Sequence, residues 1–99
     1  MTQPVQLTEK ELVVLRLLAG TEQYGLELVN ASDGALKRGT VYVTLARMEE
    51  KGLLLVRRPP PGKHEAGLPR PRYRASALGQ RLLAATEQWL VHVKGGRTA

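Results

Sequence analysis

The sequence contains no cysteine among its 99 residues. Without thiols there are no disulfides and no thiolate metal ligands, and this composition fits a reducing cytoplasm, where we expect the protein to act. Only two histidines occur, His64 and His92, and they are far apart in the chain. Because a zinc site needs about four ligands in tetrahedral geometry, we expect no bound metal, and nothing in the sequence calls for a cofactor.

Catalytic and membrane signatures are also missing. No Ser-His-Asp set, paired carboxylates or phosphate-binding glycine loop stands out, so we do not expect an enzyme. The first residues, 1–4, are polar and resemble no signal peptide. No apolar run approaches the roughly 20 residues of a transmembrane helix, so we expect no membrane partner.

Positive charge is concentrated in the middle of the chain. The formal net charge is +6, yet residues 1–36 carry −3, residues 37–74 carry +7 and residues 75–99 carry +2. A focused cationic patch attracts polyanions and speeds association with them. A solvated basic surface without a partner is the alternative interpretation.

The stretch 39–51 predicts a helix with two different faces. Val41, Leu45 and Met48 recur at i, i+4 and i+7 and predict a buried face. Gly52 is expected to end the helix in the left-handed conformation. An ordinary amphipathic helix has the same periodicity. The other face, however, carries side chains of the kinds that touch phosphates and base edges: Thr40, Val43, Thr44 and Arg47.

Two shorter helices precede this one. Thr8 and Glu11 form a predicted capping box for a helix over 9–19. Thr21 is the predicted N-cap of a helix over 23–31, and residues 30–34 have the composition of a turn. Two helices separated by a tight polar turn, the second with a contact-rich face, indicate a helix-turn-helix.

A β-hairpin with a basic tip follows. Residues 53–58 are β-prone, a proline run stops them at 59–62, and residues 71–75 return as a second strand. Such a hairpin is a wing. Its cations are expected to follow a phosphate backbone, adding affinity rather than sequence information: Arg57, Arg58, Lys63, Arg70, Arg72 and Arg74.

Ser76 is the predicted N-cap of a last helix over 77–94. The helix at 9–19 is apolar on two sides and the last helix carries a wide apolar stripe, so a monomer would expose extensive apolar surface. We therefore expect a homodimer. The residues expected at its interface are Leu12, Val13 and Leu17 in the first helix, and Leu82, Leu83, Thr86, Trp89, Leu90 and Val93 in the last.

Trp89 is the only tryptophan. It is interpreted first as a packing residue of the dimer core. The alternative is a flat aromatic wall that binds a planar, small hydrophobic effector at the dimer centre.

With these residues identified, the chain resembles the PadR family of winged-helix transcriptional regulators over about residues 8–90. The resemblance rests on two blocks. The first contains Tyr24-Gly25, Glu27-Leu28, Gly39 to Tyr42, Leu45, Arg47 to Glu49 and Gly52 to Leu54, and the second contains Arg70 to Tyr73, Ser76 and Gly79. Where the family often has Ser-Pro before Gly-Thr, this chain has Lys37-Arg38. Where the family has two adjacent tyrosines, it has Arg72-Tyr73.

The resemblance implies a homodimeric regulator, usually a repressor, that binds a palindromic operator. It also implies that dimers form through the first and last helices, and the chain matches the short members that lack a separate effector domain. The predicted fold is mainly α with a small β wing, a winged helix-turn-helix plus a C-terminal dimerisation helix. One domain is expected, divided into residues 8–58, 59–75, 76–94 and a tail at 95–99.

The functional prediction is a sequence-specific regulator of transcription that binds double-stranded DNA. Tyr42, Thr40, Thr44 and Arg47 are expected to contact phosphates and bases, with Lys37 and Arg38 binding phosphate at the helix start. The rival prediction is a winged-helix module for protein–protein interaction that touches no DNA, since fold alone does not decide function. A protein-binding module has no need to gather +7 around one helix and a wing.

Overall fold

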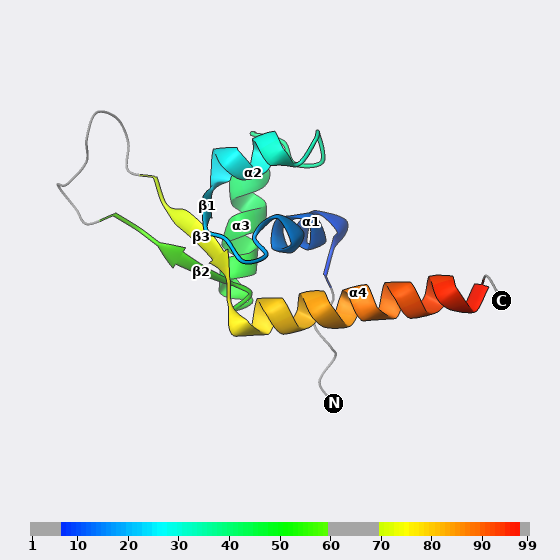
Figure 1. Ribbon diagram of the computed structural model, residues 1–99. Helices are drawn as coiled ribbons and strands as arrows, with labels where there is room; N and C mark the ends of the chain where they lie inside the picture. The colour runs from blue at the N-terminus through cyan, green and yellow to red at the C-terminus, as the bar shows by residue number, and fades with distance from the viewer. Residues whose placement is uncertain (1–6, 60–69, 98–99) are drawn as a thin grey trace.

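The computed structural model describes residues 7–59 and 70–97, with the side chains of 90–97 left aside. The described residues form four helices and a small antiparallel sheet whose strand order is β1-β3-β2, with α1, α2 and α3 on one side of the sheet (Figure 1). The prediction of a mainly helical winged-helix fold with a small β wing is confirmed. In chain order the elements are α1 (Glu9–Leu17), β1 (Gln23–Tyr24), α2 (Gly25–Ala31), α3 (Val41–Glu50), β2 (Leu54–Arg57), β3 (Arg72–Ala75) and α4 (Ala77–Arg97).

The predicted helix signals at both ends of the α1–α3 unit are confirmed. The Thr8 hydroxyl accepts from the Glu11 amide at 3.2 Å, and the Thr8 amide donates to the Glu11 carboxylate at 2.9 Å. After α3, Gly52 adopts a φ of +78°. The Leu53 amide then donates back to the Met48 carbonyl at 2.9 Å, so the chain folds onto the last turn before entering the wing.

Several predicted helix boundaries are wrong. Residues 23 and 24 are not helical but form β1, because they complete the free edge of β3 through the pairs Gln23↔Tyr73 and Tyr24↔Arg72. Helix α2 therefore starts at Gly25, and its capping partner is the Glu27 carboxylate, which accepts from the Tyr24 amide at 2.8 Å, rather than Thr21.

At the start of α3, the amides of Thr40 and Val41 both donate to the Lys37 carbonyl, at 3.2 and 2.9 Å. This turn over 37–40 delays the helix from the predicted residue 39 to Val41. At the other end of the chain, α4 continues to Arg97, three residues beyond its predicted end at 94. Helix α1 ends at Leu17, two residues before its predicted end.

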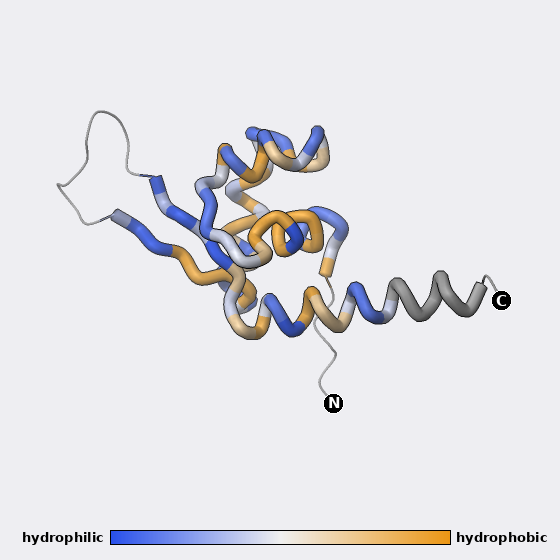
Figure 2. The backbone as a smooth tube through the Cα atoms, in the orientation of Figure 1, coloured by the Kyte–Doolittle hydropathy of each residue, from blue (hydrophilic) through white to orange (hydrophobic). Residues whose placement is uncertain are grey.

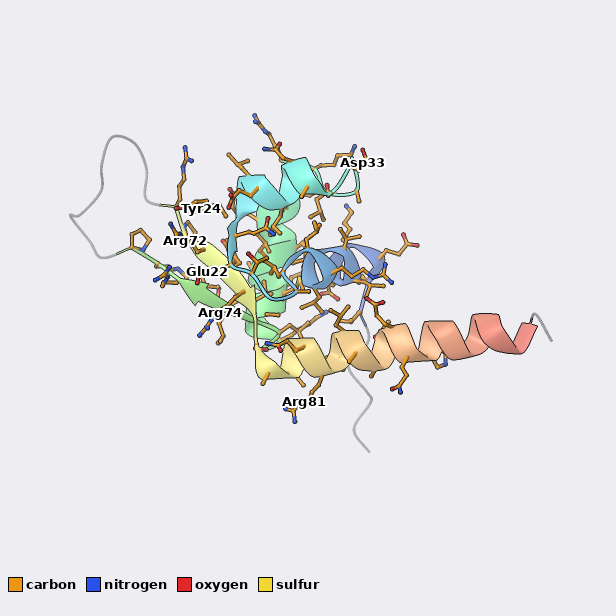
Figure 3. The ribbon with its side chains drawn as sticks, viewed as in Figure 1. Glu22, Tyr24, Asp33, Arg72, Arg74 and Arg81 are labelled. Atoms are coloured by element: carbon orange, nitrogen blue, oxygen red, sulfur yellow. The ribbon has the colours of Figure 1, made fainter. Side chains whose placement is uncertain are left out.

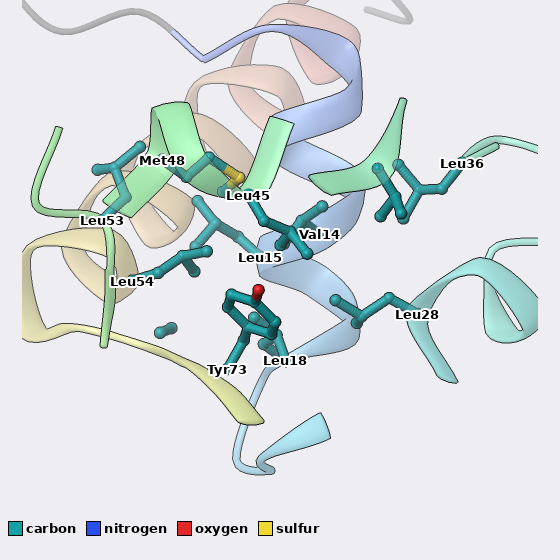
Figure 4. Packing of buried hydrophobic residues seen from close by; sticks show 12 residues of the cluster. Val14, Leu15, Leu18, Leu28, Leu36, Leu45, Met48, Leu53, Leu54 and Tyr73 are labelled. Atoms are coloured by element: carbon teal, nitrogen blue, oxygen red, sulfur yellow. The ribbon is translucent and has the colours of Figure 1, made fainter. Parts of the chain in front are cut away.

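The core lies where α1, α2 and α3 meet the inner face of the sheet (Figures 2 and 4). The predicted buried face of α3 is confirmed, since Val41, Leu45 and Met48 are almost fully buried. The turn between α2 and α3 adds Leu36. The remaining members are Val14, Leu15, Leu18, Leu28, Leu53, Leu54, Tyr73 and Ala75.

The start of α4 is hydrogen-bonded to the segment that follows α3. The Ser76 hydroxyl accepts from the Gly79 amide at 3.0 Å, which confirms Ser76 as the N-cap, and donates to the Gly52 carbonyl. A Cβ at Gly79 would collide with the Leu53 carbonyl oxygen, so only glycine permits this approach. From this anchor α4 extends past α1 and away from the rest of the fold (Figure 1).

The second apolar side of α1 has a partner within the same chain. Val13 and Leu17 of α1, and Leu82 and Leu83 of α4, are partly buried against the core. Four of the residues expected at a dimer interface therefore pack, at least in part, inside one chain. Of the others, Leu12 and Thr86 are half-buried and Trp89 is 62% exposed, while the side chains of Leu90 and Val93 lie outside the described part of the structure.

A buried carboxylate joins α1 to α3. The Glu11 side chain is only 4% exposed; one of its oxygens accepts from the Thr8 amide, and the other lies 2.7 Å from the Lys51 ammonium. Burial raises the pKa of Glu11, but the hydrogen bonds from Lys51 and Thr8 outweigh burial and hold the pKa below its ordinary value. The charged form of Glu11 therefore stabilises the fold.

We predict that Glu11→Gln lowers the free energy of unfolding by about 1–2 kcal/mol at pH 7, because the charge-assisted hydrogen bond to Lys51 is lost. A depressed folded-state pKa contributes stability that disappears as the pH falls through it. The difference between variant and wild type should therefore shrink at pH 3, measured by urea unfolding at both pH values. Glu9→Gln, on an exposed neighbour, is the control and should stay within about 0.5 kcal/mol. A difference that is equal at both pH values would contradict the role of the Glu11 charge.

Candidate nucleic-acid interface

The outer face of α3 collects most of the predicted contact residues. Because one side of the helix is buried in the core, the residues between its buried positions must face outward. Tyr42, Val43 and Arg47 are exposed there, Thr44 is half-buried, and the turn before the helix exposes Lys37, Arg38 and Thr40. The structure thus brings together all seven residues predicted in and just before this helix. It also places Glu50 on the same face, which the sequence argument did not consider.

A groove of about 560 Å³ runs along one side of α3. Its far wall is the first turn of α1, and its near wall is formed by Thr40, Val43, Thr44 and Arg47. A second, larger cleft of about 700 Å³ lies on the other side of α3, between α2, Tyr42 and wing residues Arg70 and Pro71. The outer face of α3 is therefore a ridge between two hollows, a shape suited to entering a groove on a partner.

Tyr42 is seated on the backbone of α2. A Cβ built on Gly25 would lie 2.7 Å from Cε1 of Tyr42 and 2.9 Å from its hydroxyl oxygen. Only a glycine gives the ring this seat without displacing it. The first residue of α2 therefore sets where the aromatic side chain of α3 points.

The wing has an inner and an outer face. Strand alternation buries Leu54, Tyr73 and Ala75 and turns Arg72 and Arg74 outward. In the β2–β3 ladder Arg57 is paired with Arg72, so both side chains lie at the tip end of the ladder, on the outer face of the hairpin. Figure 3 shows Arg72 there, near Tyr24 and Glu22.

Carboxylates hold three of the predicted phosphate contacts. Arg57 Nη2 lies 2.6 Å from Glu22 Oε1, and Arg72 Nη1 lies 3.6 Å from the same oxygen. Arg72 also donates to the Tyr24 hydroxyl at 2.8 Å, with its guanidinium carbon 4.9 Å from the ring centroid. The hydrogen bond to Tyr24 and the nearby Glu22 raise the pKa of Arg72.

Arg58 has its own carboxylate on α3. Its two terminal nitrogens lie 3.2 and 3.1 Å from the two oxygens of Glu49, a bidentate pair. Hydrogen bonding from Arg58 holds the pKa of Glu49 below its ordinary value. Neither pairing could be predicted from the sequence, because Glu22 and Glu49 meet their arginines only after the wing has folded back. Glu22 and Arg57 are 35 positions apart, so their pairing leaves no local signal.

The remaining predicted cations fall into two groups. Lys37, Arg38 and Arg47 have no ion pair with any described residue and lie at or beside α3. Arg70 and Arg74 are equally unpaired within the described ranges and belong to the wing, Arg74 on the sheet face that points away from the core. Lys63 lies outside the described residues.

Other chemistry has little support in the described ranges. Residues 7–59 and 70–97 contain no group of three His, Cys, Asp or Glu side chains placed to hold a metal ion. In the same ranges no helix is both long and apolar enough to cross a membrane.

No protein-family sequence model matches the chain, and no curated protein sequence matches it. Solved structures do match. A PadR-family transcription regulator from hypervirulent Clostridium difficile R20291 is 23% identical, with a TM-score of 0.76 over 92% of this chain and 96% of that one. A PadR-family transcriptional regulator from Eggerthella lenta DSM 2243 is 29% identical, with a TM-score of 0.69 over 89% and 78%. The chain has the PadR fold.

The PadR likeness extends to a structure that contains DNA. Bacillus subtilis PadR in complex with operator DNA is 17% identical and matches with a TM-score of 0.70. The match covers 87% of this chain and 49% of that one.

The residues that carried the PadR resemblance have identifiable structural tasks. Gly25 provides the seat for Tyr42, and Gly79 with Ser76 fixes the start of α4 against the chain after α3. Tyr24 hydrogen-bonds Arg72 at the start of β3. These residues position α3 and the wing, and they need not touch a ligand themselves.

We predict that Gly25→Ala is destabilising only when Tyr42 is present. In the wild type the new methyl group must displace the ring, whereas in a Tyr42→Ala background it only adds helix propensity, which favours Ala over Gly. Urea unfolding of the four proteins should give a coupling energy of at least about 1 kcal/mol. An identical effect of Gly25→Ala in both backgrounds would show that Tyr42 does not rest on this glycine.

Proposed function

We propose that this protein is a PadR-type, sequence-specific DNA-binding regulator of transcription that acts as a homodimeric repressor. The observation that carries the proposal is the exposed face of α3, preceded by Lys37 and Arg38, which have no ion pair with any described residue. The fold is shared with a protein solved in complex with operator DNA. A binding function suits the two hollows beside α3 and the concentration of charge around it.

In the proposed complex α3 enters the major groove. The N-terminal end of a helix carries unsatisfied amides and a partial positive charge, so it favours phosphate oxygens. Lys37 and Arg38 add two full charges at that end. Val43, Thr44 and Arg47 would then face base edges, with Thr40 and Tyr42 at the groove wall, while Arg70, Arg74 and Lys63 reach the flanking backbone.

The homodimer is proposed from the apolar surface that one chain leaves uncovered. Trp89 is 62% exposed on the part of α4 that extends past α1, and Leu12 is only half-buried. A two-fold axis beside α4 would bury both and place two α3 helices in successive major grooves, about 34–36 Å apart. Two facing Trp89 rings would also offer stacking surfaces to a small planar hydrophobic effector.

We predict specific duplex binding that weakens steeply with salt, because each neutralised phosphate releases condensed counterions. A selection from random duplexes gives the preferred site, and fluorescence anisotropy between 50 and 200 mM salt, the range over which phosphate contacts lose roughly 10³–10⁵ in affinity, gives the slope. Arg47→Ala should cost about 1–3 kcal/mol on that site and relax one position. Lys37→Ala should weaken all sequences alike.

Arg81→Ala is the matched control for charge. Arg81 is exposed on α4 and points away from the body of the protein (Figure 3), so its removal should leave the preference unchanged. No duplex binding by the wild type would refute the proposed function and favour a protein-interaction module.

We predict a sedimenting mass of twice the 10.9 kDa chain at micromolar concentration. Trp89→Asp should shift the protein towards monomer, because a charge would be buried without a partner in the interface. Gln88→Asp introduces the same charge at an exposed neighbouring position and should remain dimeric. A wild-type mass of one chain would overturn the homodimer.

A further inference from the structure

Three arginines at the tip end of the wing ladder, Arg57, Arg58 and Arg72, are accessible to a nucleic acid and yet already paired. The side chains of Arg57 and Arg58 are 66% and 62% exposed, so a phosphate can reach either of them. Glu22, by contrast, directly precedes β1, is only 26% exposed and lies within reach of Arg57 on β2 and Arg72 on β3. The carboxylate is therefore a fixed feature of the surface, and the guanidinium groups gather around it.

We infer that Glu22 and Glu49 are specificity-determining residues that withhold three wing arginines from phosphate. This inference rests on the proposed DNA-binding function. Glu22 holds Arg57 and Arg72, and Glu49 holds Arg58 in a bidentate pair. With both carboxylates in place, the three arginines and two glutamates together carry a net charge of only +1.

The physical reason lies in how phosphate contacts act. They raise the affinity for every sequence equally and carry no sequence information. An arginine that leaves its carboxylate to bind a phosphate exchanges one charge-assisted pair for another, so its net gain on DNA is small. Sequence preference, read by α3, then makes up a larger share of the total affinity.

The pairing is selective among the described cations. Lys37 and Arg38, at the start of α3, face no carboxylate within the described ranges, and neither does Arg47. These three lie where base edges and their adjacent phosphates would be, whereas the paired arginines lie on the hairpin that flanks them. The carboxylates thus restrain only part of the wing. Arg57, Arg58 and Arg72 are paired, while Arg70 and Arg74 have no ion pair within the described ranges, like the cations at α3.

The same contacts fix the direction of the wing. Arg57 and Arg72 are opposite each other in the ladder, and Arg72 is also held by the Tyr24 hydroxyl and ring. Glu49 ties the end of β2 to α3 through Arg58. Glu22→Gln therefore releases Arg57 and Glu49→Gln releases Arg58, while the ladder remains and Arg72 loses its Glu22 contact but keeps that to Tyr24.

The test uses Glu22→Gln and Glu49→Gln in the full-length protein. Dissociation constants are measured by anisotropy on the selected duplex and on a random-sequence duplex across a salt series. Each variant should bind the random duplex at least about threefold more tightly at low salt, with a salt slope steeper by about 0.9 for each phosphate newly contacted. The affinity ratio of selected to random duplex should fall in both variants.

Combined variants separate release of the arginines from simple loss of negative charge. Glu22→Gln is repeated in an Arg57→Ala/Arg72→Ala background, and Glu49→Gln in an Arg58→Ala background. If the carboxylates act by holding the arginines, the gain on random duplex should largely disappear in these backgrounds. An equal gain with and without the arginines would overturn the inference, since it would then reflect bulk charge alone.

The remaining outcomes are also decisive. Suppose the wild type binds DNA in a salt-dependent way, but the affinity of folded Glu22→Gln and Glu49→Gln for the random duplex stays level or falls. That result overturns this inference and leaves the proposed function standing. A wild type that binds no duplex removes both. Thermal unfolding of each variant establishes that it is folded. Glu49→Gln should have little effect on stability, because the Glu49–Arg58 ion pair is exposed.

Discussion

The placement of α3 depends on one buried carboxylate. Glu11 receives an amide from Thr8 on one oxygen and the Lys51 ammonium on the other, so a single side chain closes the first turn of α1 and holds the last turn of α3. Val41, Leu45 and Met48 set which face of α3 is buried. The charged contact between Lys51 and Glu11 fastens the C-terminal end of the helix to α1 in that orientation.

Much of the fold could be predicted from the sequence because its signals are local. The spacing of Val41, Leu45 and Met48 specifies a buried face, and Gly52 ends that helix with a φ of +78°. What the sequence did not predict depends on distant partners. Residues 23 and 24 have no strand pattern of their own and become β1 only because β3 offers an edge. The second apolar side of α1 could not be assigned either, since α4 and a second subunit are equally apolar partners.

The sequence predicted where the candidate residues of α3 would lie, but it did not predict how the charges of the wing would be paired. Residues of α3 inherit their direction from the helical repeat, so Thr40, Val43 and Arg47 are found together on one side. Charges in a hairpin have no such constraint. The count of +7 over residues 37–74 overstates the cations that are unengaged, because Glu22 comes from outside that segment and holds two of its arginines.

The hydrogen bonds at the start of α4 couple the direction of this long helix to that of α3. Ser76 and Gly79 leave no flexible joint between α4 and the turn that follows α3, since the Gly52 carbonyl, the Ser76 hydroxyl and the Gly79 amide form one continuous hydrogen-bonded path. Helices α3 and α4 would therefore move together as one rigid unit. If two chains met along α4, a small change in the angle between the two α4 helices would rotate both α3 helices, and the distance between the α3 helices would change with that angle.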